Sequence, residues 1–305
     1  MAYKNFEFDR AVVAVNPKST NSRRVKTELS HVNLPLELVE TNKDPRRTLE
    51  NLQGTLRHGT PETDLIIIAG GDGVANQIGN MALANTKLFA RGGDASDGAT
   101  MLNGRKTLDT ILRTGKIMNF FPIDTITESS EGSVARKANW YFGAANDAAA
   151  DHEIDLLKDS STKVARYSGL LIARQFVATM RTMGNIQTVV STAEDGVESN
   201  VSDRLYTNGD RIAKIGRPNS RLDVPEFESF VSPKLTKAQA LLGMAQMLAG
   251  KRESTMMTRD YFMLTSPDGS PIYTQYDGEV GQVESGSKFT IGISPDSYSV
   301  ITTRY

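Results

Sequence analysis

The clearest candidate for a chemical role is the sequence Gly-Gly-Asp-Gly at residues 70–73, directly after the most apolar segment of the chain, 64–69. Glycines lack side chains, so backbone N–H groups can approach a phosphate closely where a strand passes into a helix. Asp72 is the unusual member, because a carboxylate repels an anion. It suits a base for an attacking hydroxyl or a link to Mg²⁺. The alternative is a tight turn in which Asp72 only caps the helix.

A second polar segment, 16–22, follows another apolar run, 11–15, and precedes a basic stretch at 23–26. In a parallel sheet covered by helices, this loop falls on the same edge as the glycine turn. Amide, hydroxyl and basic groups at that edge suit a nucleotide triphosphate. The alternative is an ordinary loop, with Ser22 as a helix N-cap and the basic residues on a solvated helix face.

Strands and helices must alternate in the first part of the chain to place these loops together. The apolar pattern predicts strands at 11–15, 36–39, 64–69 and 117–124, and helices at 22–30, 44–59, 74–88 and 107–113. Continuous apolarity in the third strand indicates that both of its faces are covered. This order predicts a doubly wound α/β domain.

Beyond Asp124 the pattern changes to alternating strands separated by turns, so the rest of the chain is predicted to be mostly β. Strands are expected at 186–193, at 197–206 and in a series over 261–305, with turns at 266–269 and 277–278. Helices are expected at 145–158, at 166–180 and at 232–250, where Ser232 would cap the helix, Pro233 would lie in its first turn and Gly250 just past its end. The predicted domains are therefore 1–124 and 125–305.

Composition limits the function classes. The chain of 305 residues is long enough for two domains, and its 35 basic and 36 acidic residues leave a net charge of −1, which argues against an electrostatic hold on nucleic acid. The chain has no cysteine and only three histidines, so carboxylates are expected to carry out most of any proton transfer. No apolar run approaches the about 20 residues that cross a bilayer, and no signal peptide is recognisable. A cytoplasmic protein is expected.

In order and spacing, the motifs resemble the lipid kinase family of diacylglycerol kinases, sphingosine kinases and bacterial multi-lipid kinases, over nearly the whole chain. The matching segments of the first half are Asn16-Pro17-Lys18-Ser19, Thr41, Gly70 to Val74, Gly93 to Asp97 and Ile123-Asp124. Those of the second half are Phe142 to Ala149, Lys163 with Arg166 and Gly169, and Tyr276-Asp277-Gly278-Glu279.

The resemblance implies an ATP-binding α/β domain and a β-sandwich lipid-binding domain with helices, with the lipid entering the cleft between them. It implies an ATP site formed by Asn16, Pro17, Ser19, Thr41, Gly70, Gly71, Gly73, Val74, Gly93 and Asp97. Asp72 and Glu279 would flank the acceptor hydroxyl as catalytic carboxylates, and Asp97 and Asp124 would hold Mg²⁺. The implied reaction transfers the γ-phosphate of ATP to a diacylglycerol-like lipid at a membrane surface, where the protein would bind transiently. An exposed β edge in the second domain would permit a homodimer.

Several positions depart from the family pattern. Val74 replaces a threonine hydroxyl, Gln77 replaces a glutamate, and Asp94 places a negative charge where a threonine is expected. Taken alone, Asp277-Gly278 is better explained as a hairpin turn, since four other Asp-Gly pairs occur in the chain; with the resemblance, a turn that also presents Glu279 is expected. Two alternatives therefore stay open. One is an NAD kinase-like enzyme, which shares the glycine loop, although its downstream Asn-Glu motif is not evident. The other is a non-catalytic nucleotide- or lipid-binding protein.

Overall fold

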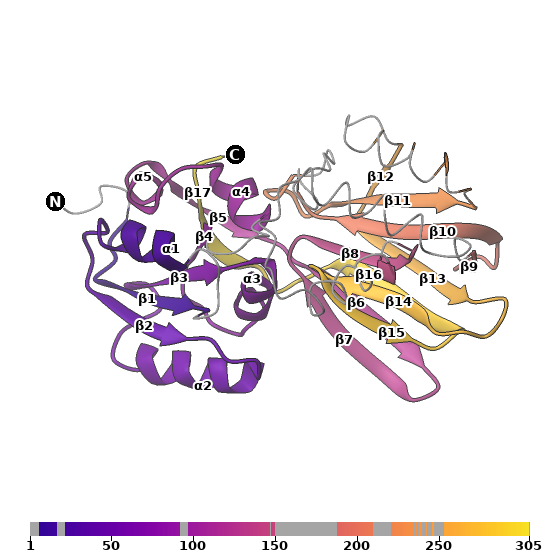
Figure 1. The fold of residues 1–305 in the computed structure, drawn as a ribbon, viewed down its shortest axis with the longest axis horizontal. Helices are drawn as coiled ribbons and strands as arrows, with labels where there is room; N and C mark the ends of the chain where they lie inside the picture. The colour runs from indigo at the N-terminus through magenta and orange to yellow at the C-terminus, as the bar shows by residue number, and fades with distance from the viewer. Residues whose placement is uncertain are drawn as a thin grey trace. The chain divides into compact units, whose positions relative to one another are not determined.

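The computed structural model describes residues 6–16, 22–91, 97–146, 148–149, 188–209, 221–234, 236, 238–239, 242, 246 and 253–304. The chain divides into two compact units, each with its own core (Figure 1). The first comprises Met1–Phe121 and Pro295–Tyr305, and the second Pro122–Ser294. No helix within the described ranges is long and apolar enough to cross a membrane.

The first unit is built on a six-stranded sheet of order β2-β1-β3-β4-β17-β5. Its strands are β1 (Arg10–Val15), β2 (Leu36–Glu40), β3 (Asp64–Gly70), β4 (Lys87–Arg91), β5 (Lys116–Phe120) and β17 (Tyr298–Thr302). Its helices are α1 (Ser22–Leu29), α2 (Pro45–Leu56), α3 (Asp72–Gly79), α4 (Asp97–Asn103) and α5 (Leu108–Thr114). Strands β1 to β4 run parallel, and β3 is buried along its whole length, as its continuous apolarity predicts.

The strand order explains why helices cover both faces of this sheet. The crossover from β1 to β2 runs one way across the sheet, and those from β2 to β3 and from β3 to β4 run the other way. Because such crossovers are right-handed, α1 lies on one face and α2 and α3 on the other. Side chains of α1 and α5 pack with Val13 and Ile67 in one core, while the alternate residues Val12 and Ile66 are also fully buried.

Two elements of the first unit end earlier in the chain than the sequence predicts. The helix expected over 74–88 stops at Gly79, and Leu88 lies in β4, where both faces of the strand are buried. The helix was predicted too long because apolar Leu88, which belongs to the buried strand β4, also fits the helical spacing of apolar residues. The strand expected over 117–124 is interrupted after Phe120, because Pro122 has no N–H group for a sheet hydrogen bond. Helix α4 was not predicted.

The end of the chain returns to the first unit, in contrast to the expected division into 1–124 and 125–305. Strand β17 pairs in parallel with β4 and antiparallel with β5. Val300 and Ile301 are fully buried there, and the Tyr298 ring centroid lies 5.1 Å from that of Phe120. A strand pattern in the sequence does not say which sheet it joins, so this return was not predicted.

The second unit is an antiparallel sheet of order β15-β14-β8-β10-β9-β13-β16-β6-β7, with β11 on β10 and β12 on β11. The strands along the chain are β6 (Ile123–Ser129), β7 (Gly132–Ala138), β8 (Tyr141–Ala145), β9 (Val189–Ala193), β10 (Glu198–Thr207), β11 (Phe227–Pro233), β12 (Thr255–Met257), β13 (Arg259–Thr265), β14 (Ile272–Tyr276), β15 (Glu279–Val283) and β16 (Ser287–Ile293).

This sheet folds over on itself. In a flat sheet β8 and β16 would be four steps, or about 19 Å, apart. Yet the ring centroids of Phe142 on β8 and Phe289 on β16 lie 5.9 Å apart. The two ends of the strand order also meet, since the hydroxyl of Ser130, between β6 and β7, donates to Glu284, just after β15, at 2.8 Å. The result is a sandwich-like arrangement in which both layers belong to one continuous sheet around an aromatic core.

The helix predicted at 232–250 begins later than expected. Ser232 and Pro233 belong to β11 and pair with β10. The described helical positions start at 238, and Thr236 and Gln239 form a reciprocal cap in which each side chain accepts the other's N–H. Thr236, not Ser232, is therefore the N-cap. Two further helices were expected, at 145–158 and at 166–180. Of these, only residues 145–146 and 148–149 are described, and Ala145 belongs to the end of β8.

Candidate functional site

Three of the predicted site segments lie at the carboxyl edge of the parallel sheet. Asn16 follows β1 and its N–H donates to the carbonyl of Ala69 at 3.4 Å, while Thr41 follows β2 and its N–H donates to Val15 at 2.9 Å. Gly70 ends the neighbouring β3. The ladder register thus aligns Asn16, Thr41 and the glycine turn side by side, at the edge where ligands bind in this fold class.

A basic residue that the sequence analysis missed ends β4 at the same edge. Arg91 pairs in register with Gly70. The signal that could have identified Arg91 is its place as a basic residue directly after the apolar run of β4. Its guanidinium adds positive charge to the edge that carries the glycine turn.

The glycine turn leads directly into α3. Gly71 is the N-cap, without a side-chain capping bond, and the N–H of Ala75 is bonded to the Gly71 carbonyl at 3.0 Å. The reading in which Asp72 caps the helix is therefore wrong, because Asp72 is already the first helical residue. The N–H groups of residues 72–74 come before the first helical hydrogen bond, so they have no acceptor within the helix. Such N–H groups at the start of a helix favour the binding of an anion. The Asp72 side chain lies outside the described part of the structure.

Gly70 allows the turn to pack closely. A Cβ atom added at Gly70 would lie 2.6 Å from the Cβ of Val74, closer than two such atoms can approach. Val74, which replaces the threonine of the family pattern, is half-buried against this glycine. Glycine at position 70 is thus required by strand-to-helix packing, whatever it also allows a ligand to do.

The second departure, Gln77, has a structural role. Its side-chain amide donates to the carbonyl of Asn42 at 3.2 Å, which ties α3 to the loop that follows Thr41. The N–H of Asn42 in turn donates to Thr48 in α2 at 2.9 Å. An ionised glutamate has no hydrogen to donate, so it would lose the bond to Asn42. Gln77 therefore connects two of the segments at the carboxyl edge.

Several predicted residues cannot be placed. Pro17, Ser19 and Gly93, together with Asp94, Lys163, Arg166 and Gly169, lie outside the described residues. Asp97 begins α4, but its side chain is not described. Gly73 lies within the first turn of α3.

The described carboxylates do not assemble a magnesium site. Asp124 was expected at the end of a strand of the first sheet, but it lies on β6 of the second unit, opposite Lys137 on β7. The Lys137 ammonium is 3.9 Å from its carboxylate. Among the described residues, no group of three histidine, aspartate or glutamate side chains is close enough to hold a metal ion. Asp124 is thus placed as the ion-pair partner of a lysine.

The Asp-Gly-Glu segment of the second unit forms a tight hairpin. Asp277 and Gly278 have φ angles of 51° and 86°, as the two central residues of a type I′ turn require. The buried Asp277 carboxylate accepts hydrogen bonds from the N–H groups of Asn139, Trp140 and Tyr141 at 2.7, 2.8 and 2.8 Å. The turn reading is therefore correct for Asp277, and the turn presents Glu279 as the first residue of β15.

Glu279 shares a face of the hairpin with Tyr276, its cross-strand partner. Arg136 reaches over this face from β7, with its guanidinium carbon 5.1 Å from the centroid of the Tyr276 ring. Partial burial raises the pKa of Glu279, and the positive charge of Arg136 opposes that rise. Arg136 was not predicted, because nothing in the polar pattern of β7 shows that the folded sheet brings it to this hairpin.

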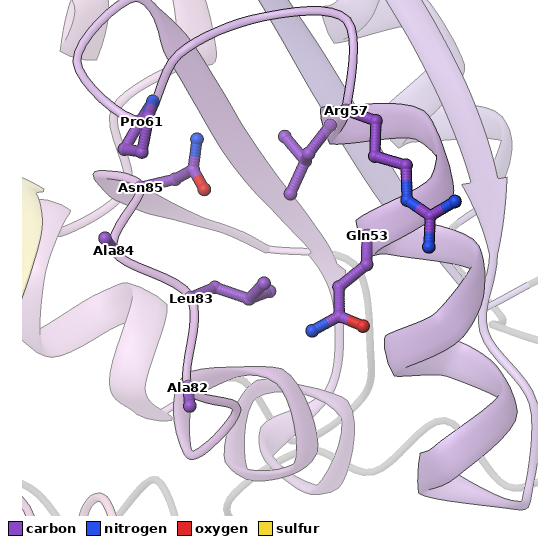
Figure 2. A pocket seen from close by; sticks show the side chains of 8 residues that line it. Gln53, Arg57, Pro61, Ala82, Leu83, Ala84 and Asn85 are labelled. Carbon is purple, nitrogen blue, oxygen red and sulfur yellow. The ribbon is translucent and has the colours of Figure 1, made fainter.

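The cavity in Figure 2 lies away from the candidate site. It has a volume of about 360 Å³ and is lined by residues from the end of α2, the segment before β3 and the segment before β4. Its lining residues are Gln53, Leu56, Arg57, Pro61, Ala82, Leu83, Ala84 and Asn85. They precede β3 and β4, so the cavity opens at the amino edge of the parallel strands, opposite the glycine turn.

The fold is similar to that of solved structures from Bacillus anthracis. Three of them match with TM-scores of 0.63, 0.66 and 0.61 at 15%, 16% and 15% identity, and each match covers 98% of both chains. All three are described as diacylglycerol kinases, two of them as a provisional assignment. No protein family model and no curated protein matches the sequence. The expected resemblance to bacterial diacylglycerol kinases is confirmed at the level of the fold.

Proposed function

We propose that the chain is an ATP-dependent lipid kinase that transfers the γ-phosphate of ATP to the hydroxyl of a diacylglycerol-like lipid. The observation that carries this proposal is the alignment of Asn16, Thr41 and the Gly70-Gly71 turn at the carboxyl edge of the sheet, with the N-terminus of α3 directed to the same edge. Such an edge favours a phosphate chain. The shared fold with the Bacillus anthracis structures supports a kinase over the other classes.

In the proposed reaction, the lipid hydroxyl oxygen forms a bond to the γ-phosphorus. The bond from that phosphorus to the bridging oxygen breaks to release ADP, and the hydroxyl proton passes to a carboxylate. Asp72, at the start of α3, and Glu279, at the start of β15, are the two carboxylates proposed for this proton. Phosphoryl transfer depends mainly on positioning and charge neutralisation, so the backbone N–H groups of residues 72–74 and Arg91 are assigned to the phosphates.

Magnesium bound to ATP would neutralise part of the phosphate charge. The described carboxylates do not gather into a site for it.

The proposal is tested by the acceptor dependence of ADP formation. The purified protein is incubated with Mg-ATP and detergent micelles, with or without diacylglycerol, and a parallel reaction contains NAD in place of the lipid. ADP formation that requires diacylglycerol, together with a phosphorylated lipid product, is expected. Phosphorylation of NAD, or ATP binding without turnover on any acceptor, would support the NAD kinase or the non-catalytic alternative instead.

A further inference from the structure

Arg136 has an unusual position for a charged side chain. It lies on β7, and its guanidinium is stacked over the ring of Tyr276 on β14, at the other end of the strand order. A Cβ atom added at Gly281 on β15 would lie 3.6 Å from its Nη1 atom, so the guanidinium also extends along β15. Within the described residues it forms no hydrogen bond and no ion pair. The stacking therefore holds a cation whose N–H groups are all available.

The same face of the hairpin carries Glu279. The register pairs Tyr276 with Glu279 and Thr274 with Gly281, so all four residues share the face over which Arg136 lies. The 3.6 Å separation is an ordinary van der Waals distance, so the guanidinium lies against β15 at position 281 without a clash. The geometry thus places a fixed positive charge beside the candidate catalytic carboxylate.

We propose that Arg136 is a positioning residue for Glu279: its guanidinium, held on the Tyr276 ring, keeps the Glu279 carboxylate ionised and ready to accept a proton. This inference rests on the proposed function, in which Glu279 is one of the two candidate bases. It also explains why the guanidinium is held by a ring and not by a carboxylate. A direct ion pair with Glu279 would occupy the oxygen that must take the proton.

The groups around Glu279 support this assignment. Glu279 is solvent-exposed, yet partial desolvation by the protein around it raises its pKa, and Arg136 is the positive charge that opposes the rise. The other titratable groups at the hairpin are Tyr276, Tyr141 and Asp277. Burial raises the pKa of Tyr276, so it stays neutral, and Asp277 is enclosed by three backbone N–H groups. The Tyr141 hydroxyl lies 3.4 Å from where a Cβ on Gly278 would be. Arg136 is thus the cation among the described groups that face Glu279.

The first test measures the charge coupling without activity. The carboxyl ¹³C resonance of Glu279, identified by its loss in Glu279→Gln, is titrated in the full chain and in Arg136→Met. Removing the cation should raise the pKa of Glu279, because the positive charge that favours the ionised carboxylate is lost. Arg136→Lys should restore most of the difference. Lys137→Met is the matched control, because it removes the same charge from the next residue, which faces Asp124.

The second test is the pH dependence of lipid phosphorylation. If Arg136 positions Glu279 for catalysis, the acid limb of the rate profile moves to higher pH in Arg136→Met by the same amount as the titration. An unchanged Glu279 titration overturns the proposal, and so does a shifted titration with an unmoved rate profile. If the titration shifts but the wild-type protein phosphorylates no lipid, the charge coupling stands and the proposed function fails.

Discussion

Asp277 and Tyr141 are hydrogen-bonded in both directions. The Asp277 carboxylate accepts the N–H of Tyr141 at 2.8 Å, and the N–H of Asp277 donates to the carbonyl of Tyr141 at 3.0 Å. Because the same carboxylate also accepts the N–H groups of Asn139 and Trp140, the β14–β15 hairpin is fixed to the start of β8. The position of Glu279 is therefore set by a buried anchor two residues away.

Asp277→Asn should weaken this anchor. The amide nitrogen that replaces one carboxylate oxygen cannot accept a hydrogen bond, so at least one buried N–H group loses its partner. We expect a loss of about 2 kcal/mol in the free energy of unfolding, measured by urea denaturation. Asp195→Asn, at the exposed Asp-Gly turn before β10, is the matched control and should have little effect. An equally small effect at Asp277 would show that the anchor does not stabilise the hairpin.

Gln77→Glu restores the residue of the family pattern and separates two explanations of this departure. If Gln77 ties α3 to the loop after Thr41, the loss of its bond to Asn42 should weaken ATP binding by about threefold, the effect of one modest hydrogen bond. Isothermal titration calorimetry with ATP measures this. If Gln77 instead marks a lost catalytic group, Gln77→Glu would raise the rate of phosphate transfer.

Gly70→Ala and Gly54→Ala should change stability in opposite directions. The new Cβ at position 70 would collide with Val74, which should cost about 2 kcal/mol or more. At position 54, within α2, nothing lies within 4 Å of the new Cβ, and the higher helix propensity of alanine should add about 0.7 kcal/mol. Thermal and urea unfolding measure both. Equal effects at the two positions would contradict the packing role of Gly70.

Lys87 should give stability an unusual pH dependence. This lysine, at the start of β4, is fully buried, and burial lowers its pKa from 10.5 to about 8. Its ammonium donates to the Leu83 carbonyl at 2.9 Å and lies 4.4 Å from the centroid of the Tyr298 ring. Between pH 8 and 10.5 the unfolded chain binds more protons at this site than the folded one, so stability rises with pH.

The measurement compares the wild type with Lys87→Met on either side of the lowered pKa of Lys87. Between pH 7.5 and 9.5 the free energy of unfolding of the wild type should rise by about 2 kcal/mol relative to the variant. A difference that stays constant between the two pH values would show that Lys87 titrates like an exposed lysine.

The sequence predicts the first unit better than the second. The continuous apolarity of β3 and the glycines that follow it are local signals, and they located the strand-to-helix turn. The placement of Asp124 and Arg136 depends on pairings between distant segments, which no local pattern contains. Asp124 lies in the second unit because Pro122 interrupts the strand, and Arg136 reaches the Tyr276 ring, on the hairpin that carries Glu279, only because the large sheet folds over on itself.

Transfer of labelled phosphate tests the central claim most directly. The wild type and Asp72→Asn are each incubated with γ-labelled Mg-ATP and a bacterial lipid extract, the organic phase is counted, and ATP affinity is measured in parallel. We predict label in the organic phase for the wild type. Asp72→Asn should abolish it while leaving ATP affinity within a few-fold, since a base acts in the transition state and not in nucleotide binding. An organic phase without label, although the wild type binds ATP, would contradict the assignment as a lipid kinase.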